Sequence, residues 1–598
     1  MTIVRRIAII NILSIVSLLS ACGGGSTTSN NPPVASTSSS GVGSSSGSST
    51  SSSASSSTSS SSGSSTSSST SSSSGSSSTS SSGGTTSSSS SGASAGTDVL
   101  TYHNDTMRTG QNLTEITLTP ANVKSATFGL LRILKADNAV DATPLIATNV
   151  AIAGVSHNVI YIATEADSVY AYDADSGAAL AQVSMLAAGE TPSDTRSCAQ
   201  VEPEIGITST PVIDRSVGPN GTLFVVAMSK DSSGNYYHRL HALDLATLAE
   251  RVPAVIIQAT YTGSGVNSSA GLQTFQAGQY KERGALLAVN GQIYTVWASN
   301  CDYMPYNGWI IAYNETTLAQ TAVLNYTPNG SMGAVWSVAG LAADSAGALY
   351  GLAGNGTFDT ALSSTGFPAQ ADYGNAAIKI SSTATTLTVA DYFAVPNTVS
   401  ESNGDIDLGS GSPMLLPDQT DATGTVRHLM IGAGKDGNVL LLDRDNLGKF
   451  NASTNHAYQY VTSALPGGLF SAFAYFNGSV YVADVGGTLK AFALSQALLP
   501  ASASSQSSAI FPRPGTSPAV SANGSSDPIV WAVVSGTGAA AELHAYNPAN
   551  LQQEYYNSTQ AANGRDAFGN GEKFITPVIA NGKVFVGTPS GVAVFGLL

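Results

Sequence analysis

Short apolar segments recur along most of the chain, and Gly, Asn, Asp and Pro separate them. One unit repeats: a small-residue turn, an apolar strand, a Gly or Asn turn, a second apolar strand, and a strand that ends near Asp or Asn. Segments rich in Val, Ile, Tyr and Ala between turn residues are typical of β-strands, whereas helical periodicity is scarce here. The pattern therefore predicts an all-β protein built from repeats.

The last strand of the repeat is the easiest part to recognise. It occurs eight times: "VYAYDADSG" at Val169, "LHALDLATL" at Leu240, "IIAYNETTL" at Ile310, "AAIKISS" at Ala376, "VLLLDRDNLG" at Val439, "LKAFALS" at Leu489, "LHAYNPANL" at Leu543 and "VAVFG" at Val592. The opening turn also occurs eight times, from "ATPL" at Ala142 to "ITPV" at Ile575. Several strands in units of roughly 45–75 residues favour an eight-bladed β-propeller over a sandwich or a β-helix. Two segments are candidates to complete the last blade: "LTYHNDTMRTGQN" from Leu100 and "FGLLRILKA" from Phe128.

The first residues have the form of a secretory signal, with Arg5 and Arg6 before a short apolar run. The end of this run, "LSAC", resembles the lipobox of bacterial lipoproteins, which implies a signal peptide over residues 1–21 and a lipid on Cys22. Gly23, in place of an Asp, favours anchoring in the outer membrane, facing the periplasm or the cell surface. A plain signal peptide with an incidental cysteine is the alternative.

Residues 22–97 are nearly all Ser, Thr and Gly. They carry too little apolar surface to offset the entropy of ordering, so we expect a disordered, Ser-rich tether. The propeller is then expected over residues 98–598.

The formal net charge of −15 argues against nucleic acid as a partner. If Cys22 is lipidated, Cys198 and Cys301 remain, and an oxidising compartment favours a disulfide between them. The sequence lacks a Cys-x-x-Cys-His motif, so we expect no c-type haem.

The unit "VYAYDADSG" resembles the repeat of the quinoprotein alcohol dehydrogenase superfamily, and the resemblance extends over the chain after Asp98. Non-catalytic propellers carry similar repeats, among them a lipoprotein of outer-membrane protein assembly. In the dehydrogenases, pyrroloquinoline quinone (PQQ) stacks on a Trp in the central funnel, and an Asn ligates a Ca²⁺. The resemblance implies these two roles for Trp336 in "GAVW" and Asn355 in "LAGNG".

Three further residue types match. "AGKDGNVLLLDRDN" is similar to a family segment whose Lys or Arg contacts the quinone oxygens, which implies that role for Lys435. "NGDIDLGSG" lies where the family has its catalytic base and a Ca²⁺ contact, and it leaves Asp405 and Asp407 as alternatives, Asp405 being the closer fit. Asp302, in "SNCDYMPYNGW", takes the place of the family's Glu ligand to Ca²⁺.

Other features depart from the dehydrogenases. The family's adjacent cysteine pair is absent, and Cys198 and Cys301 map instead to the mouth of the funnel. Five nearby residues form an expected polar and aromatic rim that either binds small polar or sugar-like ligands or only packs loops: Glu202, Glu204, Tyr303, Tyr306 and Trp309.

Two functions follow from these patterns. The absence of the cysteine pair and of haem favours a membrane-anchored module that binds a small polar ligand or a protein partner. The alternative is a PQQ- and Ca²⁺-dependent dehydrogenase that oxidises an alcohol or a sugar, with Asp405 as the base and Lys435 stabilising the reduced quinone. The structural alternatives are that Trp336 packs between blades, that Asn355 and the two aspartates form turns, and that Lys435 lies in a surface turn.

Overall fold

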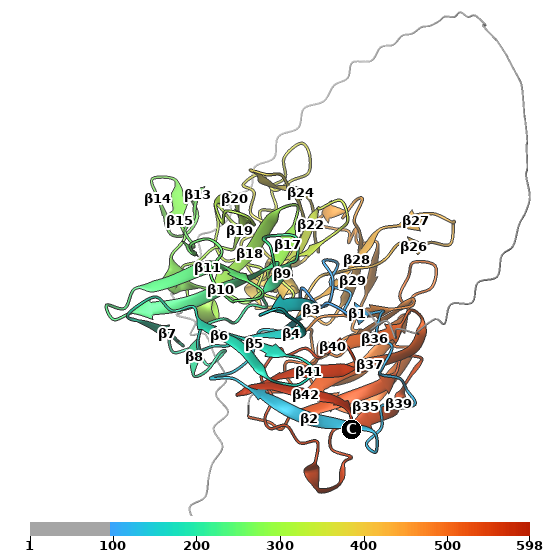
Figure 1. Ribbon diagram of the computed structural model, residues 1–598. Coiled ribbons are helices and arrows are strands. Elements are labelled where there is room, and N and C mark those ends of the chain that lie inside the picture. Colours follow the sequence, from blue (N-terminus) through green and yellow to red (C-terminus); the bar gives the residue numbers. More distant parts are fainter. Residues whose placement is uncertain (1–95, 537) are drawn as a thin grey trace, which may run out of the picture. The chain divides into compact units, whose positions relative to one another are not determined.

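The computed structural model describes residues 96–536 and 538–598, and the regular secondary structure of this part of the chain is almost entirely β-strand (Figure 1). Cys22 and nearly all of the predicted tether lie outside the described residues. Among the residues described, no helix has the length and apolar character needed to cross a membrane.

Eight sheets of four to six strands succeed one another along the chain, and we number them as blades 1 to 8. Blade 1 contains β3 (Leu145–Ile152), β4 (Val155–Ala163), β5 (Ser168–Asp173) and β6 (Ala179–Ser184). Blade 2 contains β7 (Glu190–Asp194), β8 (Glu204–Ile205), β9 (Val212–Asp214), β10 (Thr222–Asp231), β11 (Tyr236–Asp244) and β12 (Val255–Ile256). Blade 3 contains β16 (Tyr280–Glu282), β17 (Leu287–Val289), β18 (Gln292–Ser299), β19 (Trp309–Asn314) and β20 (Gln320–Asn325). Blade 4 contains β21 (Ala342–Ala343), β22 (Leu349–Leu352), β23 (Ala377–Ser382), β24 (Leu387–Ala394) and β30 (Lys449–Phe450).

Blades 5 to 8 follow in the second half of the described chain. Blade 5 contains β25 (Met414–Leu415), β28 (Leu429–Ala433), β29 (Val439–Asp443) and β31 (Gln459–Val461). Blade 6 contains β32 (Ala474–Phe476), β33 (Ser479–Val482), β34 (Gly487–Ala493) and β35 (Ser505–Phe511). Blade 7 contains β1 (Gln111–Asn112), β36 (Ala519–Asn523), β37 (Ser526–Val534), β38 (Glu542–Asn547) and β39 (Asn550–Asn557). Blade 8 contains β2 (Phe128–Lys135), β40 (Val578–Ala580), β41 (Lys583–Thr588) and β42 (Gly591–Leu597).

Short elements lie in the connections. They are the strands β13 (Thr260–Thr262), β14 (Ser268–Ser269), β15 (Leu272–Thr274), β26 (Gln419–Thr420) and β27 (Val426–Arg427), the helix α1 (Thr398–Asn403), and the single 3₁₀ turns η1 (Ala277–Gln279), η2 (Asn300–Asp302), η3 (Leu408–Ser410) and η4 (Ala562–Gly564).

The predicted eight-bladed propeller is confirmed. Each of the eight strands recognised in the sequence belongs to a different sheet: β5, β11, β19, β23, β29, β34, β38 and β42. Neighbouring blades cover both faces of the inner strands, so the sequences of these strands are continuously apolar. In β10, for example, the first eight residues are all buried. This is why the repeat is visible as apolar runs rather than as strict alternation.

The ring closes through β2. This strand pairs antiparallel with β42, so the segment from Phe128 completes the last blade, and Figure 1 shows the two strands side by side. The other candidate, from Leu100, was wrong for that role, because its end forms β1 and pairs in parallel with β36 of blade 7.

Residues 99–112, which we call the central segment, instead contact all eight blades. In six blades, the second residue of an inner strand donates its N–H to a carbonyl of the central segment: Ile146 to Val99, Ile213 to Leu100, Ala343 to Thr106, Leu415 to Met107, Tyr475 to Thr109 and Val520 to Gly110, at 2.8–2.9 Å. Two side chains reach the remaining blades: Arg108 bonds to the carbonyl of Leu286 at 3.2 Å, and Asn112 to that of Ile579 at 2.9 Å. The segment therefore uses the free edges of the inner strands.

The side chains of the central segment fill the channel that the blades enclose. Tyr102 and Arg108 are completely buried, and Tyr102 packs with Ala285, Val338 and Ala339 from blades 3 and 4. Arg108 also donates to the carbonyls of Leu341 and Tyr102, both at 3.0 Å. The central segment thus crosses the channel and closes it at this level.

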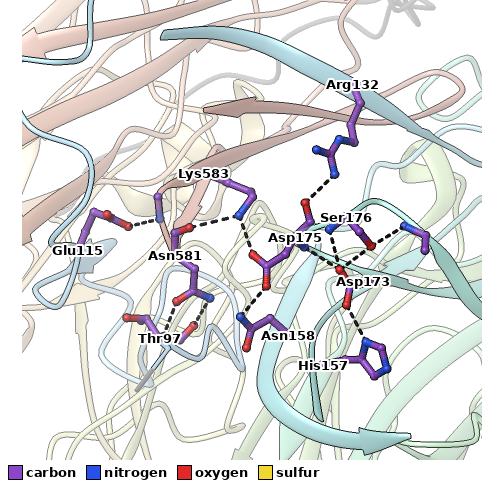
Figure 2. Close-up of polar contacts among 12 residues, drawn as sticks. Thr97, Glu115, Arg132, His157, Asn158, Asp173, Asp175, Ser176, Asn581 and Lys583 are labelled. Atoms are coloured by element: carbon purple, nitrogen blue, oxygen red, sulfur yellow. Dashed lines mark hydrogen bonds and ion pairs between the residues drawn. The ribbon is translucent and has the colours of Figure 1, made fainter. Parts of the chain in front are cut away.

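The described chain begins at the face that carries the β3–β4 and β40–β41 turns (Figure 2). The N–H of Thr97 bonds to the side chain of Asn581 at 2.6 Å. Asp175, beyond β5, accepts from Lys583 at 2.7 Å and from Asn158 at 2.9 Å, and its carbonyl accepts from Arg132 of β2 at 2.8 Å. This network joins blade 1 to blade 8 where the ring closes.

Candidate functional site

A cavity of about 270 Å³ lies in the channel, and we call it the funnel cavity. It contains all six candidate ligand, base and metal-binding residues: Asp302, Trp336, Asn355, Asp405, Asp407 and Lys435. They come from blades 3, 4 and 5 and their connections. The other lining residues are Gln200, Lys281, Arg283, Ala298, Ser299, Tyr306, Ala334, Gly354, Phe470, Arg513, Lys573 and Phe574.

The propeller topology explains why these distant residues meet. In each blade the chain enters the first strand, and leaves the second strand, at the same end of the channel. Trp336, Asp407 and Phe574 precede the first strands β21, β25 and β40, whereas Asn355 and Lys435 follow the second strands β22 and β28. The β3–β4 and β40–β41 turns lie at the other ends of these strands, so the cavity and Thr97 are at opposite ends of the channel.

Asp407 organises the blade 4 side of the cavity. Its side chain is 7% exposed, and its Oδ1 accepts the backbone N–H of Asn355 at 2.6 Å and the indole N–H of Trp336 at 3.4 Å. Gly354 is tightly enclosed, because a Cβ there would lie 2.5 Å from Asp407 Oδ1 and 2.6 Å from Trp336 Nε1. These contacts fix the indole and the Asn355 backbone against one carboxylate.

Lys435 bridges the two candidate bases. Its ammonium lies 2.7 Å from Asp405 Oδ1 and 2.5 Å from Asp407 Oδ2. Burial disfavours the charged amine, but the combined attraction of Asp407 and Asp405 outweighs this and raises the pKa of Lys435. Asp405 has a left-handed backbone conformation, with φ of 58°, and its side chain is 77% exposed. Asp405 is therefore the accessible carboxylate, and Asp407 is the enclosed one.

Asp302 approaches the cavity from blade 3. The hydroxyl of Tyr306 donates to Asp302 Oδ1 at 2.9 Å. Burial, with a smaller contribution from the negative charge of Asp407, raises the pKa of Asp302. The preceding residue, Cys301, forms a disulfide with Cys198, their Cα atoms being 6.0 Å apart. The pair predicted from the sequence therefore links a connection of blade 2 to the residue next to Asp302.

Four cations of the cavity were missed in the sequence: Lys281, Arg283, Arg513 and Lys573. The guanidinium of Arg283 lies 3.5 Å from the ring centre of Phe574 and 5.5 Å from that of Trp336. The guanidinium of Arg513 lies 4.2 Å from the ring centre of Phe470. Burial lowers the pKa of Lys281 to about 8 and that of Arg283 to about 10. The available signal was their position beside the opening turns, such as "RGAL" and "ITPV".

The predicted rim forms only in part. Tyr306 lines the cavity and Tyr303 is 41% exposed, but Trp309 is 1% exposed and packs in the interior near Phe275. Trp309 opens β19, whose inward residues are covered by neighbouring strands, so its assignment to the rim was wrong. Glu204 accepts from Asn138 at 2.6 Å in a structural contact.

The funnel cavity contains oxygen atoms of the kind that a hard cation prefers. The Oδ1 of Asn355 is buried and has no hydrogen-bond partner in the described part of the chain, whereas its Nδ2 donates to Asp405 Oδ1 at 2.8 Å. An unpartnered amide oxygen beside carboxylates suits Ca²⁺. Across residues 96–536 and 538–598, however, no three His, Cys, Asp or Glu residues are grouped closely enough to hold a metal ion by themselves. A bound cation would therefore need oxygens from a ligand as well.

Similarity to known proteins is confined to the fold. No protein-family model matches the chain, and no curated protein matches it either. The quinohemoprotein alcohol dehydrogenase of Comamonas testosteroni is 16% identical, with a TM-score of 0.54, over 83% of this chain and 80% of that one. A europium-containing methanol dehydrogenase is 11% identical, with a TM-score of 0.54, over 84% of this chain and 98% of that one.

A third similar structure is BamB from Moraxella catarrhalis. It is 13% identical over 78% of this chain and 97% of that one, and its TM-score of 0.42 is too low to support an argument. The described chain is an eight-bladed β-propeller with the fold of the quinoprotein alcohol dehydrogenases.

Proposed function

We propose that the protein is an extracytoplasmic binding module whose funnel cavity takes a planar, multiply charged organic anion of the PQQ type. The observation that carries this proposal is the charge of the cavity. Five cationic side chains line it, against three carboxylates: Lys281, Arg283, Lys435, Arg513 and Lys573 against Asp302, Asp405 and Asp407. The protein as a whole has a net charge of −15, so the charge of the cavity is opposite in sign to that of the protein.

Shape supports the same class of ligand. Trp336, Phe470 and Phe574 supply aromatic surface, and the volume of about 270 Å³ suits a compact ring system rather than a peptide or an oligosaccharide. The buried Nη2 of Arg283 has no hydrogen-bond partner among the described residues. A carboxylate of the ligand would satisfy it, because guanidinium and carboxylate form strong charge-assisted hydrogen bonds.

A hard cation is part of the proposal. Asn355 through Oδ1, with Asp405 and Asp302, would hold Ca²⁺ or a lanthanide together with oxygens of the organic anion. Such a cation polarises a bound quinone oxygen and makes the quinone a better electron acceptor. Because the protein alone offers an incomplete donor set, we expect the metal and the organic anion to bind interdependently.

A second candidate function is a PQQ-dependent dehydrogenase that oxidises an alcohol or a sugar. The exposed Asp405 carboxylate favours it, because an accessible base in the cavity can take the hydroxyl proton of a substrate. Lys435, 2.7 Å away, would hold that carboxylate in position beside a bound substrate. Two similar structures are named as alcohol and methanol dehydrogenases, which agrees with this second candidate.

The direct test is a titration of PQQ into the full-length protein with Ca²⁺, with Eu³⁺, or with a chelator. We expect quenching of Trp fluorescence and heat of binding in the presence of either metal, and loss of both with the chelator. Arg283→Met should weaken binding roughly 10–100-fold, since it removes a charged hydrogen bond. Lys449→Met is the matched control, because Lys449 bonds to the carbonyl of Thr365 outside the cavity and should not affect binding.

The stacking role of Trp336 needs its own variant. Trp336→Ala removes an aromatic face and should weaken binding by about 1–3 kcal/mol. Absence of heat and of quenching at high PQQ concentration, with either metal, would refute quinone binding. If the protein binds PQQ but does not oxidise alcohols or sugars in the presence of an artificial electron acceptor, the dehydrogenase proposal is rejected. The proposal of a binding module then stands.

A further inference from the structure

A small chamber adjoins the funnel cavity on the side of blades 1 and 2. Its volume of about 20 Å³ is enough for one water molecule. Five residues line both spaces: Gln200, Lys281, Arg283, Lys573 and Phe574. Asp141 lines only the chamber, which therefore connects a buried acid to the candidate site through shared cations.

A second buried acid, Glu165, lies near Asp141. Asp141 precedes β3 and Glu165 follows β4, so the two lie at the same end of blade 1. Glu165 is completely buried, and its Oε2 accepts from the N–H of Gly206 at 2.7 Å and from the hydroxyl of Thr208 at 3.0 Å. Within the described residues, Glu165 Oε1 and Asp141 Oδ1 are buried and receive no N–H or hydroxyl donor.

Among the described residues, the two neighbouring acids each have a buried oxygen without a donor, and a single proton between the acids would satisfy both, because carboxylate oxygens only accept. Burial, followed by mutual repulsion, raises the pKa of Glu165, and burial also raises the pKa of Asp141. The charged groups that act on the pair are Lys281, Arg283 and Lys573. Glu572 adds a further acid beside Asp141, and its pKa is raised to about 7 by burial and by Asp141.

We propose that Asp141 and Glu165 share one proton, and that an anion bound in the funnel cavity makes this pair take up a further proton. The coupling follows from the shared cations. Lys281, Arg283 and Lys573 face both spaces, so carboxylates of a ligand compete with the acid pair for the same positive charges. When the three cationic side chains pair with the ligand, they stabilise the negative charge of the acid pair less. The acid pair then takes up a proton from solvent.

The first half of this inference is independent of any ligand. Infrared difference spectra of the full-length protein at neutral pH should contain the C=O band of a protonated, buried carboxylic acid. Asp141→Asn and Glu165→Gln should each alter or remove this band, and Asp527→Asn, which changes an exposed acid, should not. Spectra in which both variants keep the parental band would overturn proton sharing. Two variants are used so that poor folding of one does not decide the outcome.

The second half rests on the proposed function and uses PQQ as the probe. Titration calorimetry at pH 7 in two buffers of different ionisation enthalpy measures the protons exchanged on binding. We expect uptake of up to about one proton per PQQ by the parent and by Asp527→Asn, and a loss of this uptake in Asp141→Asn and Glu165→Gln. Binding heat that does not depend on the buffer would overturn the coupling while leaving PQQ binding intact. No binding heat at all would overturn both the coupling and the proposed function, whereas the infrared result would still decide proton sharing.

Discussion

Asp405 and Asp407, which the sequence left as alternatives, have different environments in this propeller. Asp407 is enclosed by Asn355, Trp336 and Lys435, whereas the Asp405 side chain is largely exposed in the cavity. Asp407 is thus suited to positioning, and Asp405 is suited to contact with a bound molecule.

This difference predicts that the same substitution affects stability more at Asp407 than at Asp405. Asp407→Asn should lower the free energy of unfolding by about 1–3 kcal/mol, because it removes a buried charge that accepts hydrogen bonds and pairs with Lys435. Asp405→Asn should change it by less than about 1 kcal/mol, as for other exposed ion pairs. Urea denaturation of the two variants measures both values. Equal destabilisation by the two substitutions would contradict the assignment.

Lys281 should limit stability at neutral pH. Burial lowers its pKa to about 8 in the folded protein, against about 10.4 in the unfolded chain. Between these values the unfolded chain binds more protons, so stability rises with pH, and below pH 8 the penalty for charging the buried amine is fully present. Lys281→Met should therefore stabilise the protein by about 1–3 kcal/mol at pH 7 and by much less near pH 10. Thermal melts at both pH values test this, with Lys449→Met as the control.

At the residue scale, the resemblance to quinoprotein dehydrogenases selected Trp336, Asn355 and Lys435 from the sequence. The structure places all three side chains in one cavity, and their roles there stay predictions. Sequence analysis missed Lys281, Arg513 and Lys573 because they belong to different blades and their connections and meet only when the ring closes. Their position beside opening turns is a weak signal, since it does not by itself show that a side chain faces the channel.

At the scale of elements, the repeat could be recognised in the sequence because every blade is built from similar short apolar strands. The strands outside the repeat lack this shared pattern. The segment from Leu100, with polar residues such as His103, Asn104 and Arg108, was predicted only as one of two candidates to complete the last blade. Its place inside the channel depends on carbonyls and N–H groups of other blades, which no sequence pattern displays.

The central segment should contribute strongly to stability through Arg108. This side chain is completely buried and donates to the carbonyls of Leu341, Tyr102 and Leu286. Arg108→Met should destabilise the protein by about 3–6 kcal/mol, since several buried carbonyls would lose their donor. Arg132→Met, at the exposed contact with Asp175, should cost about 0.5 kcal/mol or less. Equal denaturation midpoints for the two variants would show that the segment does not hold the blades together.

At the scale of the whole molecule, ring closure and chain entry lie at the opposite end of the channel from the funnel cavity. Thr97 bonds to Asn581 at that far end, and the central segment separates it from the cavity. The described chain therefore begins at the end of the channel away from the cavity mouth.

This arrangement leads to a prediction about anchoring and binding together. If Cys22 carries lipid, Cys22→Ser should move the protein from the membrane fraction to a soluble or uncleaved form, because acyl chains contribute about 0.8 kcal/mol per buried CH₂ to membrane binding. The soluble form should bind PQQ with the same affinity as the detergent-solubilised parent, since the cavity is far from the point of chain entry. Fractionation followed by calorimetry measures both properties. Membrane partitioning equal to that of the parent would reject lipidation at Cys22, and a large change in PQQ affinity would reject the separation of anchor and cavity.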